Sequence, residues 1–340
     1  MTINLRVSDA IDEYMLHMHS TGAKPNTIKN HRQVLKHALI RWGNPNVCNL
    51  TSKHVTMFFV DTEWSPATRN LYLSNLRGGF FAWARRNNYM RKDFDPTDGW
   101  RNLKVTRRDR KWIPVEDFSD LLNAATTPRD RAIIALGLFT MCRAGEINSI
   151  KIGDVSFDDN TIEVYREKTE DFDTMPMSTE LRKELLTWLA IYRERMGGEL
   201  SDNWYLTPAS KSLPMSYSAE TGKLAPSGAL PAMRPTVKMR RPYEPVKRAL
   251  VVLGIDPFGS GVHLLRRSAG RALFNRLRSE GYDGALKTVS AMLGHKSVVM
   301  TEHYLGLEIE RLQRNTKFSG LPLFPDMNAG ATVTTIGKAV

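Results

Sequence analysis

The sequence predicts a mainly α-helical chain with one small antiparallel β-sheet, folded into two domains. Its 340 residues leave room for about two domains that each bury an apolar core. Residues 6–95 carry apolar side chains at helical spacing, whereas residues 150–164 alternate around the turn Asp158-Asp159-Asn160 and indicate short strands. We therefore expect a helical domain at 1–97, a basic linker at 98–112, a second domain at 113–322 and a disordered tail at 323–340.

The composition is that of a soluble globular protein with a surplus of positive charge. Apolar residues make up 41% of the chain and charged residues 25%. The net charge of +12 favours a polyanionic partner, with nucleic acid first and an anionic membrane surface second, although a generally basic surface would also account for it. Two cysteines, Cys48 and Cys142, make no disulfide framework and fit a reducing cytoplasm. The longest apolar run, Ala132 to Cys142, is too short to span a bilayer.

Four helices are expected in the first domain. The pattern predicts them at Val7–His19, from Pro25 to Trp42, at Val55–Val60 and from Pro66 onward. Proline opens two of them, in the first turn, where its missing N–H costs nothing. An apolar stripe on the last helix is interpreted as core rather than as a binding surface. This stripe consists of Tyr72, Leu73, Leu76, Phe80, Phe81 and Trp83.

Basic side chains gather on that last helix and in the linker. Arg69, Arg77, Arg85 and Arg86 on the helix either face solvent or contact phosphates, and the sequence leaves both readings open. The linker can act as a strap that tracks a duplex backbone, although like-charge runs also occur in plain linkers. Its basic residues are Arg101, Lys104, Arg107, Arg108, Arg110 and Lys111, against one acid, Asp109.

The second domain begins with an acid-rich helix start after Pro114 and continues into a buried helix that ends near Arg143. Strands are expected at Ile150–Val155 and Thr161–Val164. The hairpin loop that follows would carry Lys168. Further helices are expected at Leu181–Met196 and Pro245–Leu253.

Residues 263–304 concentrate the side chains that suit anionic chemistry. His263 and Arg266 lie three residues apart on an expected helix, so both can project from one face. His295 follows Gly294 at an expected helix end, and Tyr304 comes nine residues later on a second short helix. Imidazoles, a guanidinium and a phenol gathered in this way can grip a phosphate and move a proton.

These motifs have a family counterpart. The spacing H-x-x-R, then L-G-H, then a tyrosine nine residues on resembles the tyrosine recombinase (phage integrase) family. The family's upstream arginine box matches Arg143 with Glu146, and its hairpin lysine matches Lys168. The resemblance implies a helical core-binding (SAM-like) domain and a catalytic domain that form a C-shaped clamp on DNA. It also implies site-specific cutting and rejoining of DNA strands, in a bacterial or phage-encoded protein that acts in the cytoplasm.

The resemblance also implies a role for each matched residue. Arg143 and Arg266 would hold the scissile phosphate, since a guanidinium matches two phosphate oxygens and stays charged. Tyr304 would attack phosphorus and give a 3′-phosphotyrosine, with His263 as the base. Lys168 would protonate the leaving oxygen. His295 would donate to a phosphate oxygen, and Glu146 would orient Arg143. Neither metal nor ATP is required, and no cofactor is expected.

Several alternatives remain open on the sequence. His303 competes with Tyr304, and Arg267 competes with Arg266, although the spacing favours the matched pair in each case. Acidic residues follow Lys168 where the family often has basic ones, and Met141-Cys142 replaces the common Gly-Leu before Arg143. A type IB topoisomerase that nicks and reseals, or a DNA-binding relative without catalysis, would be the competing functions. Residues 206–242, which lack periodicity, are either a flexible insertion or a DNA-facing segment.

The expected partners follow from the same resemblance. They are double-stranded DNA carrying specific recombination sites, three further copies of the chain when assembled on DNA, and accessory DNA-bending or directionality proteins, with no membrane. A helix at Glu308–Asn315, with Ile309 and Leu312 on one side, would pack into a neighbouring protomer or else within its own chain. The resemblance begins near residue 6, so we expect no separate arm-binding domain before it.

Overall fold

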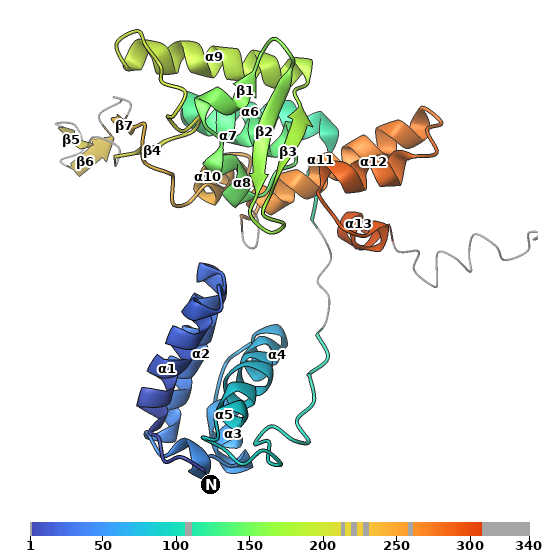
Figure 1. Cartoon of the computed structure of the whole chain (residues 1–340). Coiled ribbons are helices and arrows are strands. Elements are labelled where there is room, and N and C mark those ends of the chain that lie inside the picture. Colours follow the sequence, from blue (N-terminus) through green and yellow to red (C-terminus); the bar gives the residue numbers. More distant parts are fainter. Residues whose placement is uncertain are drawn as a thin grey trace, which may run out of the picture. The chain divides into compact units, whose positions relative to one another are not determined.

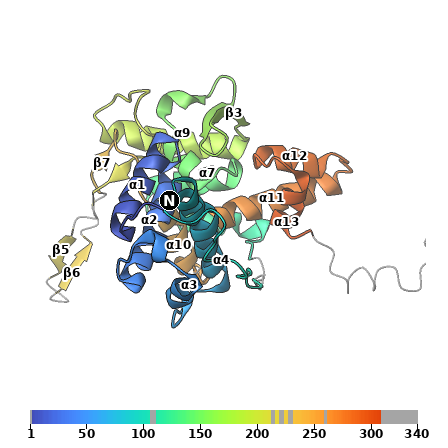
Figure 2. The same ribbon diagram turned by 60° about the horizontal axis from the view of Figure 1, so that its bottom comes forward.

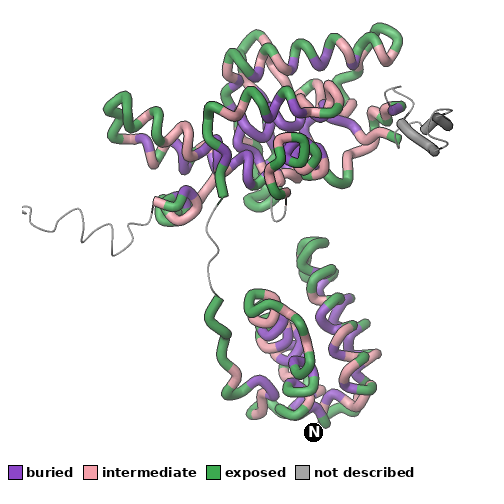
Figure 3. The backbone as a smooth tube through the Cα atoms, turned by 180° about the vertical axis from the view of Figure 1, so that it is seen from behind, coloured by how far each residue is buried: buried purple, intermediate pink, exposed green. Residues whose placement is uncertain are grey.

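The computed structural model describes residues 2–105, 111–211, 231–257 and 261–307, together with the backbone of 215–218 and 223–226. The chain divides into two compact units, Met1–Asp109 and Arg110–Val340. Each unit buries its own apolar cluster, which Figure 3 shows as a separate purple interior.

The N-terminal unit is helical, as the sequence predicts (Figure 1). Ser65 caps α4 by accepting a hydrogen bond from the Thr68 N–H, and Gly43 ends α2 in the left-handed conformation that glycine favours. The apolar stripe from Tyr72 to Trp83 is buried, which confirms its interpretation as core. The elements are α1 (Val7–Ser20), α2 (Pro25–Trp42), α3 (Ser52–Phe59), α4 (Pro66–Ser74), a π-helical stretch (Asn75–Phe81) and α5 (Ala82–Arg86).

The arginines on the last helical stretch have structural roles that the sequence did not indicate. Arg77 donates to the Thr97 hydroxyl and main-chain oxygen, and Arg85 pairs with Asp95 at 2.8 Å. Together they fasten the chain that leaves α5 back onto the helix. These two side chains are therefore neither simply solvated nor free to contact phosphates.

The C-terminal unit is built around α7 (Pro128–Phe139), a helix that is buried along most of its length. Helices α9 (Thr179–Arg195), α10 (Tyr243–Val252) and α11 (Val262–Ser279) pack against it, and α6 (Phe118–Asn123) precedes it. Because apolar residues cover nearly every face of α7, only the ends of this helix can present polar side chains. The short helix α8 (Ala144–Ser149) comes next in the chain, and Arg143 is its N-cap residue.

One small antiparallel sheet, in the order β1-β2-β3, accompanies these helices. Its strands are β1 (Val155–Ser156), β2 (Thr161–Arg166) and β3 (Asp171–Pro176), and Arg166 pairs with Asp171 at the hairpin end. The predicted strand at Ile150–Val155 is wrong except at Val155. Residues 152–154 form a 3₁₀ turn instead, because the Ile152 and Gly153 N–H groups bond to oxygens of the chain at residues 202–204.

Residues 206–242 are more regular than a plain loop. Strand β4 (Ala209–Ser210) pairs with β7 (Met233–Arg234), and β5 (Met215–Ser218) pairs with β6 (Lys223–Pro226). Strands β4 and β7, of two residues each, are too short for alternation to be detected in a sequence.

Helices α11, α12 (Ala285–Met292) and α13 (Val298–Leu305) pack against one another and lie together in both Figure 1 and Figure 2. They carry the histidine, arginine and tyrosine motifs. The predicted helix at Glu308–Asn315 and the predicted tail lie outside the described residues. Within the described part of the chain, no helix is both long and apolar enough to cross a membrane.

Candidate active site

Arg143 is held by a chain of charged side chains that begins at the N-terminus of α8. Its guanidinium donates to Glu146 Oε1 at 2.7 Å, and its main-chain N–H donates to Glu146 Oε2 at 2.6 Å. Glu146 is buried and also accepts from Arg166 at 3.0 Å. Burial alone would raise the pKa of Glu146, but the bonds from Arg143 and the charge of Arg166 outweigh it and hold that pKa below its usual range.

Arg166 is a central residue that sequence reasoning missed. Its guanidinium, only 4% exposed, bonds to Glu146, to Asp173 Oδ2 at 2.8 Å and to the Met292 carbonyl at 3.2 Å. It therefore ties α8, the β2–β3 hairpin and the end of α12 together. The available signal was the strand alternation, which places Arg166 on the same inward face as Ile162 and Val164.

Lys168 lies in the turn between β2 and β3, as predicted. It lines a pocket of about 400 Å³ together with Arg143 and His295. The remaining lining comes from the hairpin, from the turn after α12 and from Met300 on α13. Side chains from separate segments therefore share one concave surface.

Arg266 is the most deeply buried cation of the site, at 1% exposure. It donates to the main-chain oxygens of Met141 and Leu293, so both ends of its fork are fixed. Burial, with the nearby charge of Arg143, lowers the pKa of Arg266 to about 10, and the group remains protonated at neutral pH. Met141 has a φ of 54°, a left-handed conformation that glycine adopts more easily than other residues. The family commonly has glycine at this position.

His295 stands between the arginines and the tyrosine. Its Nδ1 lies 2.9 Å from the hydroxyl of Thr301, and its Nε2 lies 3.5 Å from Arg266. Loss of solvent and the charges of Arg266 and Arg143 lower the pKa of His295 to about 4. When the buried Thr301 hydroxyl donates to Nδ1, the proton of the neutral ring sits on Nε2 and can be donated to a ligand; in the other tautomer Nδ1 donates to Thr301 and Nε2 accepts from Arg266. No role was predicted for Thr301, which lies three residues before Tyr304.

Tyr304 packs edge-on against His295, with ring centres 5.3 Å apart, and the Arg266 guanidinium lies 6.0 Å from its ring centre. Its hydroxyl donates to the main-chain oxygen of His263 at 3.2 Å. Burial raises the pKa of Tyr304, and the charges of Arg266 and Arg267 oppose this rise without cancelling it. The phenol is therefore protonated at neutral pH and needs a base.

The imidazole of His263 is exposed at the start of α11. Loss of part of its solvent, together with the charges of Arg266, Arg143 and Arg267, lowers the pKa of His263. The ring is therefore mainly neutral at pH 7 and can accept a proton.

The structure describes three of the predicted DNA-binding residues of the linker. Arg101 and Lys104 are exposed in the N-terminal unit, and Lys111 pairs with Asp256 at 3.0 Å in the C-terminal unit. Arg107, Arg108 and Arg110 lie outside the described residues. Cys142, beside Arg143, is fully buried, and burial raises the pKa of its thiol, so it packs as a spacer and not as a reactive group.

Carboxylates near these cations serve as their partners. Glu146 and Asp173 each bond to an arginine, and no group of three or more histidine, cysteine or acidic side chains within the described ranges is placed to hold a metal ion.

Comparison with known proteins identifies the class to which this fold and site belong. The phage integrase family matches residues 111–311, which include every residue of the site described above. The chain is a member of that family, the tyrosine recombinases.

Two candidate integrase/recombinases of Sinorhizobium fredii are similar in sequence. The protein y4gC is 25% identical over 186 residues, which cover 54% of this chain and 80% of y4gC. The protein y4rF is 25% identical over 276 residues, which cover 78% of this chain but only 58% of y4rF.

Solved structures share the fold at low identity. A lambda integrase dimer bound to a COC′ core site has a TM-score of 0.63 at 20% identity. The match covers 89% of this chain and 77% of the lambda integrase chain. XerH recombinase in a post-cleavage complex with a difH substrate has a TM-score of 0.60 at 18% identity, covering 87% and 80%. A lambda integrase tetramer bound to a Holliday junction has a TM-score of 0.60 at 20% identity, covering 86% and 78%.

Proposed function

We propose that this protein is a site-specific DNA recombinase that cuts and rejoins strands through a covalent bond to Tyr304. The observation that carries the proposal is the convergence of two arginines and a histidine beside one phenol. The Arg266 guanidinium lies over the ring of Tyr304, and His295 packs edge-on against that ring. Arg266 also lies close to His295, and Arg143 shares a pocket with His295 and Lys168. Separate elements supply these groups, so their meeting depends on the fold and not on a local motif.

In the proposed reaction the Tyr304 oxygen forms a bond to phosphorus while the bond from phosphorus to the 5′ oxygen breaks. Arg143 and Arg266 hold the two non-bridging oxygens and stabilise the charge that grows on them. Glu146 and Arg166 keep Arg143 in place. A proton on His295 Nε2, favoured when Thr301 donates to Nδ1, adds one more donor to the phosphate.

Two proton transfers complete the step. The phenol proton passes to His263, whose lowered pKa leaves it neutral and able to accept. Lys168 gives a proton to the leaving 5′ oxygen. In the free protein the phenol donates to the main-chain oxygen of His263 rather than to its ring. DNA binding must therefore break this hydrogen bond, so the free protein is held in a resting arrangement.

Rejoining follows when a 5′-hydroxyl from a second duplex attacks the phosphotyrosine, so no ATP or metal enters the proposal. The DNA-bound recombinases of the same fold support double-stranded DNA as the substrate, and the lambda integrase tetramer supports four protomers in the working assembly. We also propose that the two units clamp the duplex and that the linker, with Arg101, Lys104, Arg107, Arg108, Arg110 and Lys111, follows its phosphates.

The test is covalent trapping. Duplexes from the DNA beside the gene, nicked near candidate sites, are incubated with protein and resolved on a denaturing gel. We expect the wild type to form an adduct and Tyr304→Phe to form none, because the variant lacks only the attacking hydroxyl. Tyr282→Phe, at an exposed tyrosine outside the site, serves as the matched control and should form the adduct normally. An adduct of wild-type yield in Tyr304→Phe would refute the assignment.

A further inference from the structure

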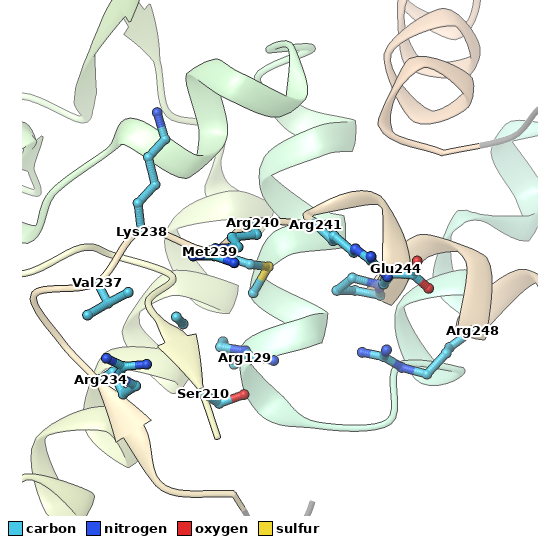
Figure 4. Close-up of a pocket in the computed structure, with 12 residues that line it drawn as sticks. Arg129, Ser210, Arg234, Val237, Lys238, Met239, Arg240, Arg241, Glu244 and Arg248 are labelled. Atoms are coloured by element: carbon cyan, nitrogen blue, oxygen red, sulfur yellow. The ribbon is translucent and has the colours of Figure 1, made fainter. Parts of the chain in front are cut away.

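A second cationic pocket, of about 510 Å³, lies on the C-terminal unit (Figure 4). It shares no lining residue with the pocket that holds Arg143, Lys168 and His295. Of the described side chains that line it, only Glu244 is acidic. The basic ones are Arg129, Arg234, Lys238, Arg240, Arg241 and Arg248.

Two of these arginines are fixed by one buried carboxylate. Asp130, 1% exposed, accepts from Arg248 at 2.6 Å and from Arg129 at 3.1 Å. Arg129 also donates to the Pro208 carbonyl at 3.1 Å. A single negative charge therefore orients two guanidinium groups and neutralises only one of them, so the wall of the pocket keeps a positive surplus.

Three more arginines have no partner within the described part of the chain. The side chains of Arg234, Arg240 and Arg241 are exposed and make no hydrogen bond, ion pair or ring contact there. Arg131 and Arg271 of this unit are bonded to glutamate or to a main-chain oxygen. The exposed Arg193 and Arg278, which lack a partner within the described residues, line neither pocket. Gathered like charges repel one another, so a cluster of unpaired guanidinium groups indicates an anionic ligand.

The pocket is connected to the active site by Lys238 and Met239. Lys238 Nζ donates to Ser149 Oγ at 2.6 Å, and the Met239 carbonyl accepts from Asn148. Both acceptor and donor lie at the end of α8, the helix that begins at Arg143. Six helical residues span about 9 Å, which equals the axial rise of roughly two to three nucleotides of one DNA strand.

We propose that this pocket binds backbone phosphates of the DNA strand, two or more nucleotides from the phosphate held by Arg143. The inference rests on the proposed function and adds a second phosphate site to it. Guanidinium forks match phosphate oxygens in bidentate geometry. Contacts of this kind fix the register of the protein on a duplex without reading its sequence. A free polyphosphate has the same chemistry, but the connection through α8 favours a ligand that continues into the active site.

The experiment compares the salt dependence of binding to a fluorescein-labelled random-sequence duplex of about 40 base pairs. The pocket variant is Arg234→Gln/Arg240→Gln/Arg241→Gln. The control variant, Lys183→Gln/Arg193→Gln/Arg278→Gln, removes the same charge from exposed residues outside both pockets. If each arginine contacts one phosphate, the slope of log K against log salt should fall by roughly 2.7 in the pocket variant. Between about 50 and 200 mM salt, its affinity should then fall roughly 40-fold less than that of the wild type.

The outcomes separate this inference from the proposed function. A slope lowered in the pocket variant and kept in the control supports the pocket as a DNA site. Equal slopes in the two variants would overturn it, since net charge alone would then explain the loss. A second arm titrates inorganic tripolyphosphate, and binding lost in the pocket variant with an unchanged duplex slope would make the pocket a small-anion site and overturn the DNA inference. Failure of the wild type to bind any duplex would instead refute the proposed function itself. Melting temperatures, expected to be unchanged, show that both variants fold.

Discussion

At the scale of single residues, Arg166 accounts for the fixed position of the Arg143 side chain. Arg143 alone could swing away from a phosphate, but Glu146 holds it, and Arg166 holds Glu146. The same guanidinium bonds to Asp173 beside the Lys168 turn and to Met292 before Gly294-His295. Arg166 thus acts on three site residues through the groups that it bonds.

Replacing Arg166 should therefore lower stability and strand cleavage together. Arg166→Met leaves Glu146 with one partner in a buried site, and breaking such a pair costs about 3–5 kcal/mol of unfolding free energy. Adding Glu146→Gln to Arg166→Met should restore part of that loss, because no buried carboxylate is then short of a partner, and the charges that lose theirs, Arg143 and Asp173, are partly exposed to water. Denaturant titration of the single and double variants measures this coupling.

The matched control is Arg276→Met, which removes an arginine from an exposed pair with Glu280 on α11 and should leave the unfolding curve unchanged. Arg166→Lys, which keeps a charge, should bind duplex DNA normally and form the Tyr304 adduct more slowly than the wild type. Wild-type adduct rates in both the lysine and the methionine variants would show that Arg166 supports only the fold.

His295 gives a prediction about pH. The pKa of His295 in the folded protein, about 4, lies below the ordinary value of 6.5. Between these two pH values the unfolded chain therefore binds a proton at His295 and the folded chain does not. This contribution to stability is fully present above pH 6.5 and is lost as the pH falls from there towards 4. The melting temperature of His295→Gln should consequently drop less between neutral and acid pH than that of the wild type.

A suitable control for this comparison is His17→Gln, an exposed histidine of the N-terminal unit. Calorimetric scans of the three proteins across that pH range provide the measurement. Parallel pH profiles for wild type and His295→Gln would contradict the low pKa assigned to His295.

At the scale of elements, the sequence was sufficient wherever one local pattern decides the outcome. Pro25, Pro66 and Ser65 mark helix starts, and the structure has α2 and α4 beginning there. The strand expected at Ile150–Val155 failed because its backbone bonds to residues 202–204, about 50 positions away. Apolar alternation within a few residues carries no information about such a distant partner.

The same reasoning applies to the site. Arg143, His263, Arg266, His295 and Tyr304 could be predicted as site residues because their spacing is a family signature. Arg166 and Thr301 could not, since their roles come from contacts made only in the folded chain, with Glu146 and His295. One of the acidic residues after Lys168, Asp173, also finds an explanation there, because it is the partner of Arg166.

At the scale of the whole molecule, assembly on DNA leads to a prediction about residues 308–315. An apolar groove of about 860 Å³ on the C-terminal unit, lined in part by Trp112, Phe118 and Leu273, is large enough to take apolar side chains of a second copy. We expect that Ile309 and Leu312 of one protomer bind in the groove of its neighbour. Truncation after Leu307 should then leave a protein that binds one half-site but does not complete strand exchange.

Gel-shift stoichiometry and a two-site recombination assay on the truncated protein measure this directly. Ile309→Ser/Leu312→Ser should reproduce the defect, whereas Glu310→Gln, on the polar side of the expected helix, should behave as the wild type. Normal tetramers and full recombination after truncation would show that the segment is not the contact between protomers.

The central claim is that Tyr304 is the nucleophile, and the residue that competes with it is the adjacent His303. The decisive measurement is tandem mass spectrometry of the trapped complex after nuclease and trypsin digestion. Cleavage after Lys296 and Arg311 releases one peptide that contains both residues. We expect a nucleotide linked through its 3′ phosphate to Tyr304, on a bond that survives acid. A nucleotide on His303, or one linked through its 5′ phosphate, would contradict it.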